Sequence, residues 1–168
     1  MGRIFSALVD HLLEDGWKFE IIDGQTALRF PVRAKSGRLN VYADVDEDKE
    51  ILSFYSYLPA NTPPERYADM AEFITRANYG MRIGNFEMDY RDGELRYKTS
   101  LDIEGGELTG KIIENLLGAN LSTMDRYFHG LMRVIYGDTP PAKLIESIEN
   151  PDKQTQRRDD DFLCGDNE

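Results

Sequence analysis

Hydrophobic residues recur along this chain with two different periods, and each change of period marks a boundary between predicted elements. Apolar side chains spaced three or four positions apart over residues 3–15 predict an amphipathic helix that ends at Gly16. From Trp17 the period becomes two. Turn signals at Asp23-Gly24 and Ser36-Gly37 then separate the strands of an antiparallel meander, which we expect to contain up to four strands.

The rest of the chain predicts a helix, a hairpin and a long helix. The run Thr62-Pro63-Pro64-Glu65 is typical of a helix start with a capping box, and this helix should reach about Asn78. Alternating residues on both sides of Asp92-Gly93 predict a hairpin. A helix from about Thr109 to Tyr136 follows, and residues 140–148 favour a short extra helix.

This order, α-ββββ-α-ββ-α, predicts an α+β fold. Because hairpin links join the strands, the sheet should be antiparallel, with about five to six strands and with helices packed on one face. Pro31 has no amide donor, so its strand should lie at an edge of the sheet or carry a bulge.

Charge and composition narrow the possible partners and the location. The 168 residues contain 20 Lys and Arg and 31 Asp and Glu, a net charge of −11, which disfavours nucleic acid and anionic membranes as partners. The single Cys164 forms no internal disulfide, and we expect a cytoplasmic protein without signal peptide or membrane span. We expect a domain over residues 1–150 and a disordered acidic tail over 151–168, where only three residues are apolar.

The chain contains no recognisable catalytic motif. Asp44, Asp46 and Asp48 have the spacing of a calcium loop, but Lys49 replaces the turn glycine, so an ordinary turn is the better interpretation. His11 and the second histidine, His129, have no histidine or cysteine at metal-ligand spacing. We therefore predict no catalytic residue, no metal site and no cofactor.

Aromatic and basic residues provide the best candidates for a functional site. Tyr42, Tyr55 and Tyr57 alternate with apolar residues, so they should lie on the sheet face opposite the helices. Tyrosine is common at interfaces because its ring buries well and its hydroxyl finds partners. Arg96 and Lys98, on the polar side of a later strand, add charge, and the five residues form our candidate partner-binding surface.

Four stretches of sequence resemble the bacterial YbjN family. They are YSYLPANTPPE at 55–65, ANYGMRIGNFEMD at 77–89, DGELRYKTSL at 92–101 and MDRY at 124–127. The resemblance implies a fold similar to type III secretion chaperones, which are typically homodimers that bind extended segments of other proteins. The family is described as regulators of sensory transduction, and the resemblance implies no catalytic residue.

These features favour a non-enzymatic interaction module, chaperone-like or regulatory. It would bind an unidentified protein partner as a homodimer, through the sheet or a groove between helix and sheet. The alternative is a small-molecule sensor with a pocket between sheet and helices. An enzyme that uses carboxylates such as Asp89 and Asp102 is a third, weaker hypothesis.

Overall fold

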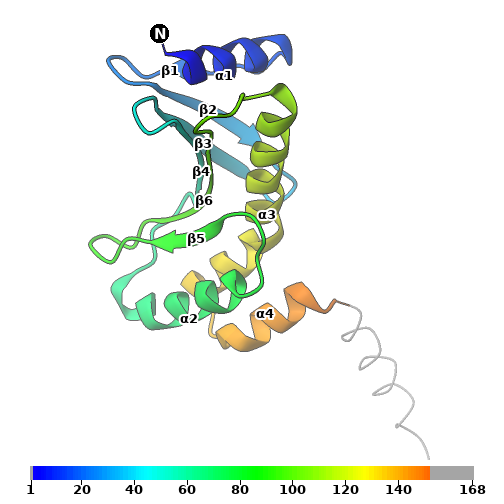
Figure 1. The fold of residues 1–168 in the computed structure, drawn as a ribbon. Coiled ribbons are helices and arrows are strands. Elements are labelled where there is room, and N and C mark those ends of the chain that lie inside the picture. Colours follow the sequence, from blue (N-terminus) through cyan, green and yellow to red (C-terminus); the bar gives the residue numbers. More distant parts are fainter. Residues whose placement is uncertain (1, 152–168) are drawn as a thin grey trace, which may run out of the picture.

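The structure, a computed structural model, describes residues 2–151 and has the predicted order of elements (Figure 1). The short helix expected over residues 140–148 is also present and is the last element. The helices and strands are α1 (Arg3–Glu14), β1 (Glu20–Ile21), β2 (Ala27–Arg33), β3 (Arg38–Asp46), β4 (Ile51–Tyr57), α2 (Tyr67–Asn78), β5 (Asn85–Met88), β6 (Leu95–Asp102), α3 (Gly110–Tyr136) and α4 (Pro141–Glu149).

All six strands join one antiparallel sheet in the order β1-β2-β3-β4-β6-β5. The meander and the hairpin meet where β4 pairs with β6. This pairing aligns Tyr55 with Lys98 and Tyr57 with Arg96, so residues from the two halves of the chain become neighbours. The α+β prediction with an antiparallel sheet is confirmed.

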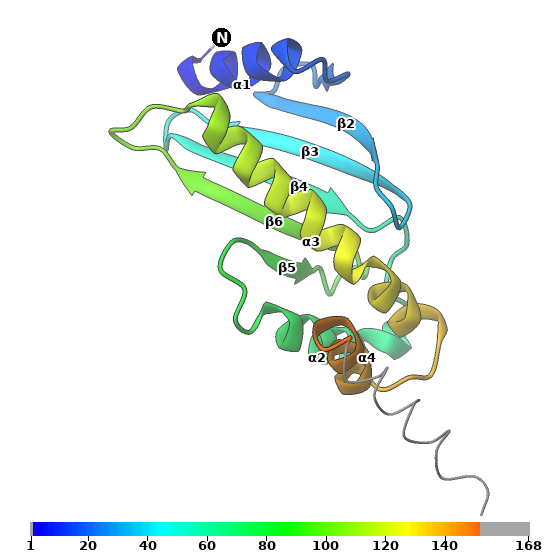
Figure 2. The same cartoon turned by 90° about the vertical axis from the view of Figure 1, so that its right-hand side faces the viewer.

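Helix α3 crosses one face of the sheet and closes the core (Figures 1 and 2). Its first turn is capped by Thr109, whose side chain accepts a hydrogen bond from the Ile112 amide at 3.4 Å. Beneath it, alternate strand residues such as Val41, Phe54 and Tyr97 are fully buried. Helix α1 lies at the β1 end of the sheet, and α2 and α4 lie at the β5 end.

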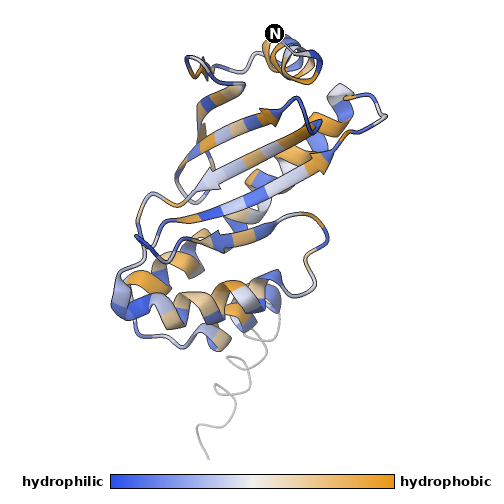
Figure 3. Ribbon diagram, turned by 60° about the vertical axis from the view of Figure 1, so that its left-hand side comes forward, coloured by the Kyte–Doolittle hydropathy of each residue, from blue (hydrophilic) through white to orange (hydrophobic). Residues whose placement is uncertain are grey.

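None of the helices that the structure describes lies on the opposite face of the sheet (Figure 3). Because side chains alternate between the faces of a strand, the polar residue next to each core position points to this side. We call it the open face and define it by the five candidate residues, Tyr42, Tyr55, Tyr57, Arg96 and Lys98, which are all partly buried.

A buried amide fixes α3 to the sheet. Asn120 is fully buried, and its Nδ2 donates to the carbonyl oxygens of Phe54 at 3.0 Å and Tyr97 at 3.1 Å. Its Oδ1 accepts a hydrogen bond from the Ser56 hydroxyl. Polar groups buried with such partners restrict how two elements can pack, so Asn120 sets the position of α3 along β4 and β6.

The predicted capping box at the start of α2 is wrong. Thr62 is buried against the turn of the second hairpin, where its amide donates to the Gly93 carbonyl at 2.8 Å. Its hydroxyl has no hydrogen-bond partner among residues 2–151. The chain then passes through a 3₁₀ turn, Pro64–Arg66, before α2 begins. Contact with the distant hairpin therefore overrides the local capping preference.

Both edges of the sheet are short. Strand β1 pairs only two residues with β2, so Pro31 lies beyond its end, where β2 itself becomes the edge, as predicted. At the other edge, the side chain of Asn78 accepts from the Phe86 amide at 2.7 Å and donates to the Phe86 carbonyl at 3.1 Å. The predicted acidic tail, apart from Pro151, lies outside the described residues.

Candidate functional site

The open face brings the five predicted residues together from three adjacent strands. Tyr42 of β3 aligns with Tyr55 of β4, which in turn aligns with Lys98 of β6. One row along, Tyr57 aligns with Arg96. The five side chains therefore form one continuous surface, although its role in binding remains a prediction.

Aromatic and cationic groups pack against one another on this surface. The rings of Tyr42 and Tyr57 meet edge to face, with centroids 5.2 Å apart. The Arg96 guanidinium lies 4.4 Å from the centre of the Tyr55 ring and donates to the Tyr57 hydroxyl at 3.2 Å. These contacts hold the long side chains in place and restrict their conformational freedom.

A carboxylate that sequence reasoning missed completes the cluster. Glu87 of β5 accepts from Arg96 Nε at 2.8 Å and pairs with Lys98 Nζ at 2.8 Å. Burial acts to raise the pKa of Glu87, but hydrogen bonds from Lys98 and Arg96 outweigh it and leave the pKa lowered. The predicted hairpin turn at Asp92-Gly93 could have indicated this contact, because pairing across the turn places Glu87 opposite Arg96.

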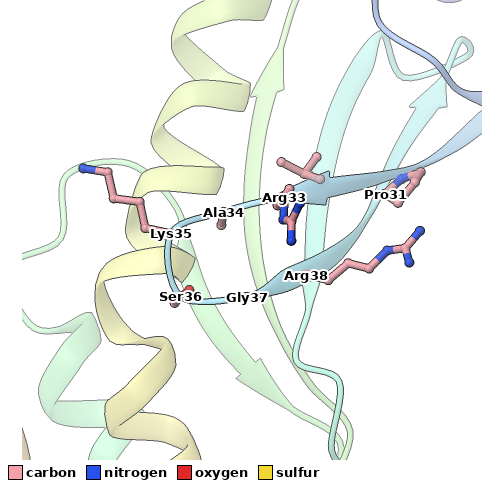
Figure 4. Close-up of a pocket in the computed structure, with 8 residues that line it drawn as sticks. Pro31, Arg33, Ala34, Lys35, Ser36, Gly37 and Arg38 are labelled. Carbon is pink, nitrogen blue, oxygen red and sulfur yellow. The ribbon is translucent and has the colours of Figure 1, made fainter.

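The β2–β3 hairpin carries a further basic surface beside the open face. Arg33, Lys35 and Arg38 border a surface hollow of about 630 Å³ (Figure 4) and form no ion pair with any residue that the structure describes. The hairpin tip is held by Asp125 of α3, which accepts from the Ser36 amide at 2.7 Å and from its hydroxyl at 2.5 Å. These bonds lower the pKa of Asp125.

The other candidate residues are separate from this surface. Asp46 accepts from the backbone amide and the ammonium of Lys49, at 3.0 and 2.9 Å, as in an ordinary turn. Asp89 forms hydrogen bonds to Arg91, which lower its pKa to about 2. It lies beside the start of β6, whereas Asp102 ends that strand, so the two carboxylates do not converge.

Comparison with known families identifies the chain. The family model YbjN, described as "Putative bacterial sensory transduction regulator", matches residues 6–132. The chain belongs to the YbjN family. No curated protein sequence matches this YbjN-family chain.

Solved structures that share its fold include the following three. YbjN from E. coli superposes with a TM-score of 0.54 at 16% identity, covering 78% of this chain and 87% of that one. A chain of the ExsC–ExsE complex gives 0.58 at 14% identity, covering 78% and 97%. A chain of the HopA1–SchA chaperone–effector complex gives 0.51 at 14% identity, covering 76% and 95%. The predicted secretion-chaperone-like fold is thus confirmed for this YbjN-family chain.

In the part of the chain that the structure describes, no helix is both long enough and apolar enough to cross a membrane.

Proposed function

We propose that this YbjN-family protein is a non-enzymatic interaction module, chaperone-like or regulatory, that binds an extended segment of a partner protein in the cytoplasm. The observation that carries the proposal is the preorganised cluster on the sheet face that none of the described helices covers. The chaperone–effector complex among the structures of the same fold adds support.

The chemistry of the open face favours a particular kind of segment. Tyrosine rings offer apolar surface that binds apolar side chains, which in an extended chain point the same way at every second position. Arg96 and Lys98 already share Glu87, so an acidic side chain of the partner would compete with or extend this ion pair. We therefore propose a segment with alternate apolar residues and at least one carboxylate.

A small-molecule sensor has less support. The interface between α3 and the sheet is filled by fully buried side chains such as Phe54, Tyr97 and Met124. Ligand pockets for small molecules typically measure about 300–1,000 Å³. The hollow between α1 and α3 is smaller, at about 150 Å³, and the hollow of about 630 Å³ is lined by the β2–β3 hairpin rather than by sheet and helices.

The test is site-specific photo-crosslinking in the host cell. A photoreactive phenylalanine analogue at Tyr57 should crosslink a discrete partner, whereas the same analogue at Tyr136, exposed at the end of α3, should not. Arg96→Ala should weaken binding of that partner about 10–30-fold, as expected for an arginine that is a binding hot spot. Arg82→Ala, an exposed arginine in no ion pair with the described residues, is the matched control.

Equal crosslinking from both tyrosine positions, or none from Tyr57, would contradict the proposal.

We also propose that the protein is a homodimer. Light scattering at micromolar concentration should then give twice the 19.3 kDa of one chain, and a monomer would refute this part.

A further inference from the structure

Three side chains with metal-ligand atoms meet where the end of α1 faces the first turns of α3. They are His11 of α1, Asp15 directly after the end of α1, and Glu114 of α3, and one ligand atom from each lies within 4.8 Å of the other two. His11 Nε2 is 3.4 Å from Asp15 Oδ2, because residues four apart share one face of a helix. This group is distant in sequence from the open-face cluster and does not depend on its role.

The His11 imidazole packs closely against α3 because residue 110 is a glycine and has no side chain. A Cβ atom at Gly110 would lie 2.6 Å from Nδ1 and 2.8 Å from Cε1 of His11, so only glycine admits the ring here. The imidazole is consequently only 14% exposed. Glu114 follows Gly110 by one helical turn, which brings its carboxylate to the same side of α3 as the ring.

The three ligand groups border open space. A hollow of about 150 Å³ between the helices is lined by His11, Asp15 and Glu114 together with apolar side chains such as Trp17 and Leu117. An ion at its mouth therefore has room for a bound water molecule as a further ligand.

One of the two carboxylates, that of Glu114, already forms an ion pair with a lysine. Lys111 Nζ lies 3.0 Å from Glu114 Oε2, one turn earlier on α3. Its ammonium group is exposed, so a divalent ion can displace it at little cost in burial.

We propose that His11, Asp15 and Glu114 bind a divalent transition-metal ion, best matched by Zn²⁺, that joins α1 to α3. One imidazole nitrogen and two carboxylate oxygens, with water in the fourth position, form a donor set that zinc accepts. Calcium and magnesium prefer oxygen ligands alone, so the imidazole selects against them.

The sequence pattern did not indicate this site, because neither histidine has another histidine or a cysteine at metal-ligand spacing. Glu114 lies about a hundred residues away in the chain and reaches His11 only through the packing of α1 on α3.

The test is titration of the full chain with zinc chloride, followed by competition with a zinc indicator dye and by thermal unfolding. All proteins carry Cys164→Ser, so the thiol cannot supply the ligand. We expect one zinc ion per chain and a rise in unfolding temperature of about 5–10 °C at free zinc near 100 times the dissociation constant. Magnesium chloride should produce neither effect.

Matched variants separate this site from adventitious binding. His11→Ala and Glu114→Gln should each abolish the stoichiometric binding, whereas His129→Ala should preserve it. Glu114 is exposed, so Glu114→Gln tests the site even if His11→Ala fails to fold. Lys111→Met removes the competing ammonium and should tighten binding several-fold.

Either of two results would overturn the proposal. One is the absence of saturable zinc binding in the protein that carries Cys164→Ser as its single substitution. The other is binding that Glu114→Gln leaves unchanged.

Discussion

A single amide in the middle of α3 is among the side chains whose loss should be most costly. Asn120 is fully buried, and its bonds to Phe54 and Tyr97 satisfy strand carbonyls that water does not reach. We expect Asn120→Ala to lower the free energy of unfolding by about 2–4 kcal/mol. Urea denaturation measures the change.

Asn115 provides the control for this prediction because it lies exposed on the same helix. Asn115→Ala should change the free energy of unfolding by less than about 0.5 kcal/mol. Alanine has a higher helix propensity than asparagine, so propensity cannot explain a loss of stability in either variant. A loss for Asn120→Ala no larger than that for Asn115→Ala would contradict the prediction.

The ion pairs of Glu87 should make its contribution to stability depend on pH. Its folded-state pKa lies below the ordinary value of 4.5, so the contribution is fully present above that value and is lost as the pH falls through the folded pKa. Glu87→Gln should therefore be about 0.5–1 kcal/mol less stable than the parent at pH 7. Urea denaturation at pH 7 and at pH 3 should show this gap closing on acidification.

An exposed glutamate serves as the comparison for Glu87. Glu107 is exposed and forms no ion pair with the described residues, so Glu107→Gln should show a small difference from the parent that is alike at both pH values. A gap for Glu87→Gln that persists unchanged at pH 3 would mean that packing, and not charge, accounts for its effect.

Residue-level prediction succeeded where strict alternation applied. The period of two placed Tyr42, Tyr55 and Tyr57 on the face away from the core, because each strand residue points opposite its neighbour. It could not reveal Asn120, whose polar side chain interrupts an apolar helix stripe, since its partners come from strands far away in sequence. Glu87 was missed for a related reason, because its importance depends on the exact register of β5 with β6.

At the scale of elements, two glycines of α3 should respond in opposite ways to the same substitution. A Cβ at Gly118 meets no atom within 4 Å, so Gly118→Ala should stabilise the protein by about 0.5–1 kcal/mol through helix propensity. A Cβ at Gly130 would lie 2.6 Å from Ile148 Cδ1 and 2.8 Å from Phe73 Cζ. Gly130→Ala should therefore destabilise it by about 1–3 kcal/mol, because α2 and α4 must shift.

Thermal and urea unfolding of the two glycine variants provide the measurement. If both substitutions stabilise the protein, then α2 and α4 accommodate the methyl group and the close packing around Gly130 is not a constraint.

Element boundaries were predictable where the local signal and the tertiary contacts agree. The long helix predicted from about Thr109 does begin there, and the Thr109 side chain caps its first turn. Thr62 has an equally good local signal, yet its backbone is bound to Gly93 and its side chain is buried. The local sequence around Thr62 does not predict its contact with Gly93.

At the scale of the whole molecule, α4 should mark the end of the folded domain. The buried core of the described residues runs from Ile4 to Ile145, and α4 is held by Tyr127, which donates to Glu149 at 2.8 Å. Burial and the nearby Glu149 carboxylate raise the pKa of Tyr127 to about 12. A chain that ends at Asn150 should keep its unfolding temperature within about 2 °C of the full chain.

A shorter chain provides the contrast. Ending at Thr139 removes the buried Leu144 and Ile145 and the partner of Tyr127, so its unfolding temperature should fall steeply. A large loss of stability in the chain that ends at Asn150 would instead extend the domain into residues 151–168.

The short edges of the sheet have a consequence for behaviour at high concentration. Fibrils grow when an exposed strand edge templates a strand from another copy. Here the free edge of β2 contains Pro31, which donates no amide hydrogen, and the Asn78 side chain occupies the outer hydrogen-bonding groups of Phe86 on β5. Concentrated solutions should therefore stay free of amyloid. Fibril seeding would first require local unfolding of the β2 edge at Pro31 or loss of the hydrogen bonds between Asn78 and Phe86.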